Sequence, residues 1–203
     1  MKIVLWVIAG LIAVVTLGGL VLYVVGSRLP REHHSQLTVT LRASRAAVWT
    51  ALTDYAAMPQ WWPAVKAVRM GQMPDGTELT FNMDKHGQEI PFRTVESRPN
   101  EKLVRMIAND QLPFGGTWSY ELADAENGGT RLTLTEDGFI NPPVFRAMAK
   151  WFLGLDTTQR DYLQHLEQHL AEKNNRGHAQ PGNKLAPTRF PASAESNDTS
   201  STS

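Results

Sequence analysis

The sequence predicts an α+β fold in which a curved antiparallel sheet surrounds a long C-terminal helix, preceded by an N-terminal transmembrane helix. Three observations predict it. The stretch from Ile3 to Val25 carries no charged residue. Residues 37–138 alternate between apolar and polar side chains in short runs separated by turn signals. Residues 141–173 place apolar side chains at helical spacing, and an amphipathic helix after a run of strands has to bury its apolar side against them.

Length and composition exclude several classes of function. The chain has 203 residues, enough for one domain of ordinary size with additional segments. Its 20 basic and 20 acidic residues balance to a formal net charge of zero, so the chain as a whole offers no electrostatic basis for nucleic-acid binding. It contains no cysteine, which excludes disulfides, zinc–thiolate sites and thiol catalysis.

Residues 1–28 predict a transmembrane anchor. A helix from Ile3 to Val25 is long enough to cross a hydrocarbon core about 30 Å thick. Trp6 and Tyr23 lie near its ends, where aromatic side chains favour the membrane interface. The alternative is a cleaved signal peptide, but its apolar core is usually shorter and ends at small residues. Residues 26–30 read Gly-Ser-Arg-Leu-Pro, a poor cleavage site, so we expect an uncleaved single-pass anchor.

A short linker, residues 29–35, precedes the main domain, which we expect to span residues 36–173. Residues 36–42 alternate strictly and predict the first strand. Ser44 is the expected N-cap of a short helix, and residues 54–63 predict a second short helix or turn.

Six further strands are expected, and turn-forming residues separate them. Their predicted ranges are 65–70, 77–84, 90–97, 103–108, 115–123 and 130–137. The sequence Asn127-Gly128-Gly129 is the strongest hairpin signal in the chain.

A long amphipathic helix is predicted over residues 141–173. Pro142 and Pro143 suit a first helical turn, where a missing N–H costs nothing. Gly154 followed by Asp156 predicts either a kink or a restart with a new N-cap. Residues 174–203 are rich in Asn, Pro, Ser and Thr, and we expect a disordered tail because few side chains there can form a core.

The stretch from Leu41 to Val68 resembles the opening of the START / Bet v 1-like superfamily, also labelled SRPBCC or polyketide cyclase/dehydrase. The matching features are Ser44, Ala47-Val48-Trp49, Leu52 with Asp54, and Trp61-Trp62-Pro63 before a Val-rich strand. Glu136-x-Gly138 and Asn141-Pro142 are similar to membrane-anchored bacterial members. The resemblance covers residues 36–172 and implies the helix-grip fold. It does not imply one reaction, because the superfamily includes lipid carriers, quinone-binding proteins, aromatase/cyclases and chaperone cofactors.

The resemblance also implies a ligand-sized cavity between the sheet and the long helix. The residues expected to line it are Trp62, Phe81, Phe92, Met106, Trp118, Tyr120, Phe145 and Met148. The alternative is that these side chains simply fill the core. Two interpretations stay open for the pair Trp61 and Trp62. In the structural one, an indole packs beneath the short helices and shapes the cavity mouth; in the functional one, the other indole is exposed and touches a ligand or the bilayer.

Several strand residues carry charge: Arg93, Glu96, Arg105, Glu121, Glu136 and Asp137. One carboxylate and one arginine that face the cavity would suit a cyclase, which polarises a carbonyl and moves a proton. The alternative is that these charges are exposed and pair across strands. Glu121 alternates with Trp118 and is expected to point away from the cavity. We assign no catalytic residue from the sequence.

No metal and no cofactor is predicted. His165 and His169 lie four residues apart, with Asp161 one turn earlier. The pattern departs from H-E-x-x-H, however, and offers no third ligand.

Together these observations predict membrane-anchored binding of a hydrophobic small molecule, either a lipid or an isoprenoid-like compound. The tether motivates the ligand class, because it holds the cavity where such molecules are concentrated. The bacterial inner membrane is expected, and the flanking charges slightly favour a cytoplasmic domain. One alternative is a cyclase/dehydrase-like enzyme, which a buried carboxylate or histidine with a perturbed pKa would favour. Another is a chaperone-like protein-interaction module, with a collapsed cavity and an exposed patch around Trp61 and Trp62.

Overall fold

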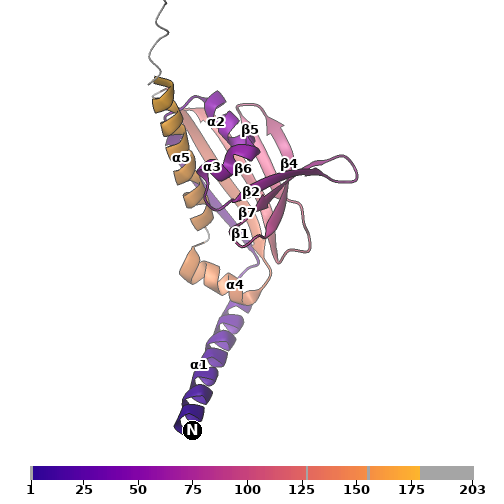
Figure 1. Ribbon diagram of the computed structural model, residues 1–203, viewed down its shortest axis with the longest axis vertical. Coiled ribbons are helices and arrows are strands. Elements are labelled where there is room, and N and C mark those ends of the chain that lie inside the picture. Colours follow the sequence, from indigo (N-terminus) through magenta and orange to yellow (C-terminus); the bar gives the residue numbers. More distant parts are fainter. Residues whose placement is uncertain (1, 127, 155, 179–203) are drawn as a thin grey trace, which may run out of the picture.

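The computed structural model describes residues 2–126, 128–154 and 156–178. Helix α1 (Lys2–Ser27) projects from one end of the molecule, and the remaining elements form a sheet with helices packed against it (Figure 1). The apolar side chains of α1 are exposed to solvent, and the helix is long and apolar enough to cross a membrane.

Seven strands form one antiparallel sheet in the order β1-β7-β6-β5-β4-β3-β2. The strands are β1 (Glu32–Leu41), β2 (Ala67–Gln72), β3 (Glu78–Met83), β4 (Glu89–Arg98), β5 (Lys102–Ile107), β6 (Phe114–Asp124) and β7 (Thr130–Ile140). Each predicted strand is present. The sheet begins earlier than predicted, because residues 32–35 of the expected linker pair with residues 136–139 of β7.

Three short helices follow β1: α2 (Arg45–Thr53), the 3₁₀ turn η1 (Tyr55–Ala57) and α3 (Met58–Trp61). Ser44 caps α2 as predicted, since its hydroxyl accepts a hydrogen bond from the Ala47 N–H. Asp54 caps η1 in the same way, because its carboxylate accepts a hydrogen bond from the Ala57 N–H. These two caps fix the path of the chain toward Trp61 and Trp62.

The predicted helix over residues 141–173 is two separate elements. Helix α4 (Pro143–Met148) continues into a π-helical turn, η2 (Ala149–Leu153), and α5 (Thr157–His178) starts afresh after a break. Gly154 has a φ of 77° at this break, a conformation that glycine adopts readily. The restart alternative was therefore correct. Residues 174–178 belong to α5 and not to the predicted tail, while residues 179–203 lie outside the described residues.

Helix α5 lies along one face of the sheet, whereas α4 packs against α1 (Figure 1). The core lies between α5 and the sheet. Its fully buried members include Leu41, Leu52, Leu103, Leu132, Leu134, Tyr162 and Leu166. A seven-stranded antiparallel sheet that grips a C-terminal helix is the helix-grip fold that the resemblance implied.

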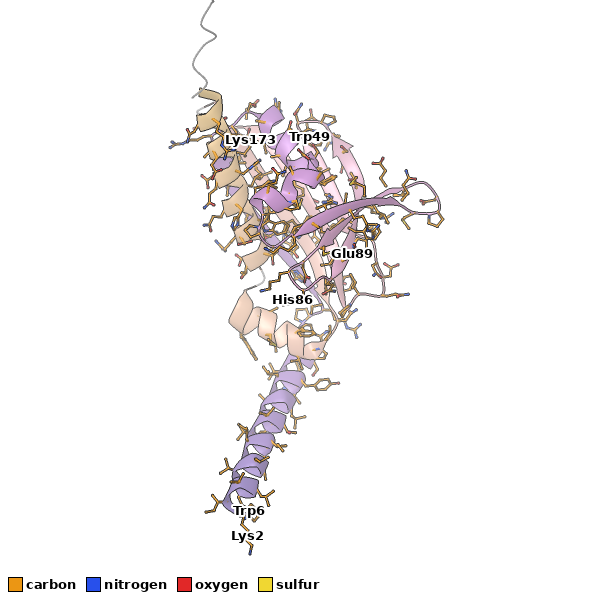
Figure 2. The ribbon with its side chains drawn as sticks, in the orientation of Figure 1. Lys2, Trp6, Trp49, His86, Glu89 and Lys173 are labelled. Atoms are coloured by element: carbon orange, nitrogen blue, oxygen red, sulfur yellow. The ribbon has the colours of Figure 1, made fainter. Side chains whose placement is uncertain are left out.

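The two ends of the sheet differ. Trp49 of α2 and Lys173 of α5 lie at the end far from α1, whereas His86 in the β3–β4 turn lies toward α4 (Figure 2). The start of β6 and the end of β7 pair at this second end, where the chain passes into α4. We refer to it as the α1-proximal end.

Candidate functional site

A cavity of about 330 Å³ lies between the sheet and α5. Its walls come from strands β3 to β7, from α3 and the residue that follows it, and from the first turns of α5. Apolar side chains such as Ile90, Phe92, Ile107 and Trp118 form most of the lining. A cavity of this size and character is typical of small-molecule sites.

Four of the eight predicted lining residues border this cavity: Trp62, Phe92, Trp118 and Tyr120. Phe81 and Met106 do not border this cavity and lie on the opposite face of the sheet. Side chains alternate along a strand, and the inward positions of β3 are the polar residues Thr80 and Asn82. Phe81 instead packs beneath the guanidinium of Arg69 on the outer face, 3.8 Å from the ring centre.

Phe145 and Met148 also lie away from the cavity. The prediction placed them on the same helix as Tyr162, but the chain breaks at Gly154, so they belong to α4. Phe145 is 56% exposed. The apolar face predicted for one long helix is therefore divided at the break. Helix α5 packs against the sheet, and α4 packs against α1.

An aromatic cluster around Tyr162 of α5 borders the cavity. The ring of Tyr162 meets those of Trp62 and Trp118 edge to face, at centroid distances of 4.9 and 5.5 Å. Tyr120 lies 5.9 Å from Tyr162. Burial raises the pKa of both tyrosine hydroxyls, so both stay protonated at neutral pH.

Trp61 and Trp62 are both buried, which agrees with the structural interpretation and not with the one in which an indole is exposed. Trp62 borders the cavity, and its indole N–H donates to a carboxylate oxygen of Asp161 at 2.8 Å. Trp61 stacks on the ring of His169, with 5.6 Å between ring centroids. With an open cavity and buried indoles, the structure has neither feature predicted for a protein-interaction module.

Arg105 brings a positive charge into this apolar space. It is 6% exposed, and its guanidinium carbon lies 4.0 Å from the ring centre of Tyr55 and 5.0 Å from that of Phe92. One terminal nitrogen donates to the Thr80 hydroxyl. The Nε atom is buried and has no hydrogen-bond partner.

Two more buried polar atoms without partners belong to cavity-lining residues. Asn82 is 7% exposed; its amide nitrogen contacts the Met58 sulfur at 3.6 Å, and its Oδ1 atom has no partner. Glu136 holds Oε1 3.4 Å from His33 Nε2, and its Oε2 atom is unpaired. Buried polar atoms normally have hydrogen-bond partners. All three atoms belong to residues that line the cavity.

The sequence named Arg105 and Glu136 among six charged strand residues without deciding which faced inward. Of the other four charged residues, three have exposed side chains and form ion pairs, as the alternative interpretation expected. Glu96 and Glu121 pair with Lys102, and Asp137 pairs with His34. Sequence reasoning missed Asn82. The available signal was its alternation with Thr80, but a polar pair on a strand normally indicates the solvent side.

The cavity extends to the α1-proximal end of the sheet. Four residues that border the cavity lie at this end. Phe114 starts β6, Ile90 is the second residue of β4, Ile107 ends β5, and Thr158 lies in the first turn of α5. Gly116, also in the lining, has a φ of 147°, and a side chain there would collide with the backbone of β7. Its missing side chain lets β6 and β7 lie close together at this edge of the cavity.

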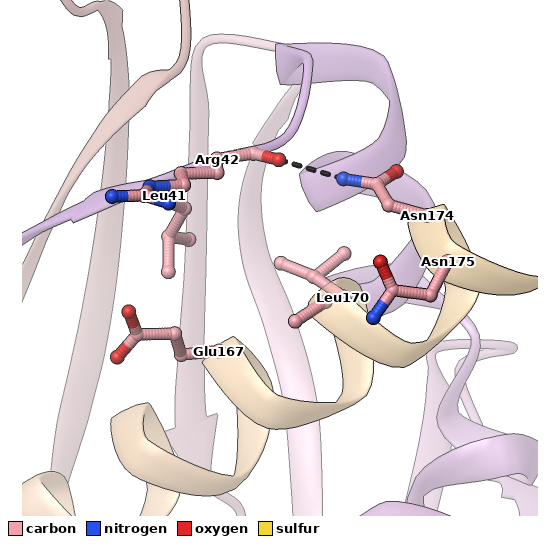
Figure 3. A pocket seen from close by; sticks show the side chains of 7 residues that line it. Leu41, Arg42, Glu167, Leu170, Asn174 and Asn175 are labelled. Atoms are coloured by element: carbon pink, nitrogen blue, oxygen red, sulfur yellow. Dashed lines mark hydrogen bonds between the residues drawn. The ribbon is translucent and has the colours of Figure 1, made fainter. Parts of the chain in front are cut away.

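A second hollow, of about 310 Å³, lies at the other end, between the end of β1 and the last turns of α5 (Figure 3). Asn174 donates to the backbone carbonyl of Arg42 there, at 2.7 Å. No buried polar atom without a partner borders it among the described residues. We therefore place the candidate site in the first cavity.

His165 and His169 do not converge on a common point. His165 Nδ1 lies 2.8 Å from the backbone carbonyl of Asp161, whereas His169 packs on Trp61. Within residues 2–126, 128–154 and 156–178, no three His, Cys, Asp or Glu side chains are grouped as metal ligands.

The sequence profile of a family described as polyketide cyclase / dehydrase and lipid transport matches residues 32–171. No curated protein matches the chain by sequence.

Solved structures match the fold. A START superfamily protein from Mycobacterium smegmatis is 18% identical, with a TM-score of 0.54 over 70% of this chain and 99% of that one. The Zhui aromatase/cyclase from Streptomyces is 17% identical, with a TM-score of 0.56 over 74% and 99%. The di-domain aromatase/cyclase BexL is 16% identical, with a TM-score of 0.57, and this chain spans 52% of its length.

Proposed function

Because the chain belongs to the polyketide cyclase / dehydrase and lipid transport family, we propose that it binds a hydrophobic small molecule, a lipid or an isoprenoid-like compound, in the cavity between the sheet and α5. The observation that carries the proposal is the set of unpaired polar atoms on Arg105, Asn82 and Glu136 in an otherwise apolar lining. The ligand has an apolar body and one polar end.

The apolar part of the ligand supplies most of the affinity. Each Å² of apolar surface removed from water contributes about 25 cal/mol. The polar end supplies orientation, because a carbonyl, hydroxyl or carboxylate oxygen accepts a hydrogen bond from Arg105 Nε. A charged donor in a low-dielectric site forms a stronger bond than a neutral one.

Helix α1 is the membrane anchor in this proposal. A tether of this kind keeps the cavity within reach of molecules dissolved in the bilayer and raises their effective concentration. The lining residues of the cavity at the α1-proximal end support this arrangement, because that end faces the membrane when α1 spans it.

A cyclase or dehydrase-like enzyme is the second candidate, and the joint presence of Arg105 and Glu136 in the cavity favours it. An arginine that donates to a carbonyl oxygen stabilises negative charge that develops there, and a nearby carboxylate accepts a proton from the adjacent carbon. A binding protein needs only the first of these two interactions.

The test compares two arginine variants of the full-length protein. Arg105→Met removes the charged donor inside the cavity. Arg69→Met is the matched control, because Arg69 also lies over an aromatic ring but on the outer face. Each protein is purified in detergent, and the small molecules that co-purify are extracted and identified by mass spectrometry.

We expect wild type and Arg69→Met to retain the same amphiphile. Arg105→Met should hold it at least about tenfold more weakly, since hydrogen bonds to charged groups contribute about 1.5–3 kcal/mol. Equal retention by all three proteins would place the ligand outside the cavity and contradict the proposal.

A further inference from the structure

Two large apolar side chains, Phe145 and Trp151, lie exposed six residues apart in α4 and η2, at the α1-proximal end. They are 56% and 51% exposed, and the half-buried Met148 lies midway between them in sequence. Phe145 and Met148, three residues apart, are neighbours on the surface of α4, and Trp151 projects from the π-helical turn that follows. We call Phe145, Met148 and Trp151 the α4–η2 stripe. A soluble surface rarely gathers side chains of this kind without a partner.

The position of the stripe relative to α1 is fixed by a close backbone contact. Gly26, in the last turn of α1, is buried against the carbonyl group of Pro143, and no side chain fits between them. Helix α4 therefore begins directly against the end of α1, at the base of the domain (Figure 1).

Arg146 stabilises this contact between the end of α1 and the start of α4, which we call the α1–α4 joint. It is buried, and its Nε donates to the Gly26 carbonyl oxygen at 2.9 Å. Its Nη1 donates to the carbonyl oxygens of Ile140 and Asn141 at 3.4 and 3.1 Å. One cation thus satisfies a terminal carbonyl of α1 and the end of β7, and a positive charge at a helix C-terminus is favourable. The stripe cannot rotate away from α1 without breaking these bonds.

We propose that the segment Pro143–Leu153 is a second membrane contact, which lies in the interfacial layer of the bilayer around α1 and inserts Phe145 and Trp151 into it. The proposal rests on the proposed function, because it requires α1 to be a membrane anchor. It extends that function by fixing how the domain sits on the membrane.

Continuity with α1 identifies the bilayer as the occupant. When α1 crosses the hydrocarbon core, its last turn and α4 lie at the headgroup level, where tryptophan is favoured. Arg28, Arg31 and Lys150 are exposed around the same joint, and basic side chains at this level attract anionic headgroups. Lys150 lies next to Trp151, as expected for an interfacial amphipathic segment.

The contact has a consequence for the cavity. The cavity-lining residues Phe114 and Thr158 lie at the α1-proximal end, near the segment that we place on the membrane. A domain held by two contacts, α1 and the α4–η2 stripe, presents this end of the cavity to the lipid surface in one orientation. A ligand then passes between bilayer and cavity without crossing bulk water.

The absence of cysteine from the chain makes a depth measurement direct. Single cysteines are introduced into the full-length protein as Phe145→Cys and Trp151→Cys, with two references. Leu11→Cys reports on the middle of α1. Val95→Cys is the matched control, because Val95 is 56% exposed like Phe145 but lies near the end of β4 that is far from α4. Each is labelled with a nitroxide in nanodiscs of mixed zwitterionic and anionic lipid.

Collision rates with oxygen, which concentrates in hydrocarbon, and with a polar nickel chelate give the depth of each label. We expect the oxygen-to-nickel ratio at positions 145 and 151 to be several-fold above that at 95 and below that at 11. Ratios at 145 and 151 equal to that at 95, with 11 immersed, would overturn the second contact and leave the anchor intact. A ratio at 11 equal to that at 95 would overturn the anchor and the contact together.

Two checks complete the test. Spin–spin broadening between labels at 145 or 151 would show that a second copy of the chain covers the stripe, and would overturn the proposal. A label-free measurement uses Trp151→Phe: brominated lipids should quench the difference in tryptophan emission between wild type and this variant. An unquenched difference would contradict membrane contact even if a cysteine variant failed to fold.

Discussion

The indole nitrogen of Trp62 donates a hydrogen bond of 2.8 Å to the carboxylate of Asp161, and so joins the end of α3 to the first turns of α5. Trp62 borders the cavity and packs edge to face on Tyr162. The bond therefore holds the Trp62 ring in the cavity wall, because it ties the end of α3 to α5. This bond also explains why Trp62 is buried. A tryptophan in a loop without such a partner would be exposed.

Asp161→Ala should destabilise the domain by about 1–2 kcal/mol, because the buried indole N–H loses its acceptor. Gln164→Ala is the control, since Gln164 is exposed on the same helix. Denaturant unfolding in detergent, followed by tryptophan fluorescence, measures both. Equal midpoints for the two variants would mean that the Trp62–Asp161 bond contributes nothing to stability.

Gly26→Ala should loosen the joint between α1 and α4, because the added methyl group would overlap the Pro143 carbonyl. Gly19→Ala is matched to it in the same helix, with no atom near the added methyl group. Hydrogen exchange of residues 143–149 should be faster in Gly26→Ala and unchanged in Gly19→Ala. Unchanged exchange in both would show that α1 and α4 are not in close contact.

The stability of the domain should fall as the pH is lowered below about 6.5. Burial, followed by the charge of Lys173, lowers the pKa of His169, whose ring stacks on Trp61. The unfolded chain therefore binds a proton before the folded chain does. The stabilisation is complete above the unfolded pKa and is lost as the pH falls toward the folded pKa.

His169→Phe tests this assignment, because phenylalanine keeps the ring contact and cannot be protonated. The decrease in melting temperature between pH 7.5 and pH 5 should be smaller in this variant than in wild type. His86→Gln, in an exposed turn, should retain the full decrease. An unaltered decrease in His169→Phe would contradict the assignment of the pH dependence to His169.

Glu136→Gln separates the two candidate functions. Glutamine keeps an acceptor oxygen at this position but is not a proton acceptor at neutral pH. A binding protein should retain its ligand unchanged in this variant. An enzyme that uses Glu136 as a base should lose about 10²-fold or more in rate while still binding the compound. Mass spectrometry of the ligand after incubation with each protein shows which of these holds.

Local patterns predicted most of the fold. The seven alternating strands, the Ser44 cap and the apolar length of α1 depend on neighbouring residues, and all are present. The break at Gly154 was predicted only as one of two outcomes. Its effect on Phe145 and Met148 depends on α4 packing against α1, a contact between segments more than a hundred residues apart.

The candidate site was harder to predict, for a reason visible on β3. Leu79, Phe81 and Met83 alternate as inward-facing apolar residues usually do, yet Asn82 lines the cavity and Thr80 accepts a hydrogen bond from Arg105. The cavity holds Arg105, so the inward face there has to be partly polar. Sequence periodicity shows that two sets of side chains alternate, and it cannot show which set meets a buried cation on another strand.

The central claim, that one ligand occupies the cavity, is tested most directly by native mass spectrometry of the full-length protein released from detergent. Ile107→Trp fills the cavity from β5, and Val95→Trp adds the same indole to the exposed position on β4. We expect one bound amphiphile per chain in wild type and Val95→Trp, and none in Ile107→Trp. A bound molecule that persists in Ile107→Trp would contradict the account, because it would lie on α1 or elsewhere outside the cavity.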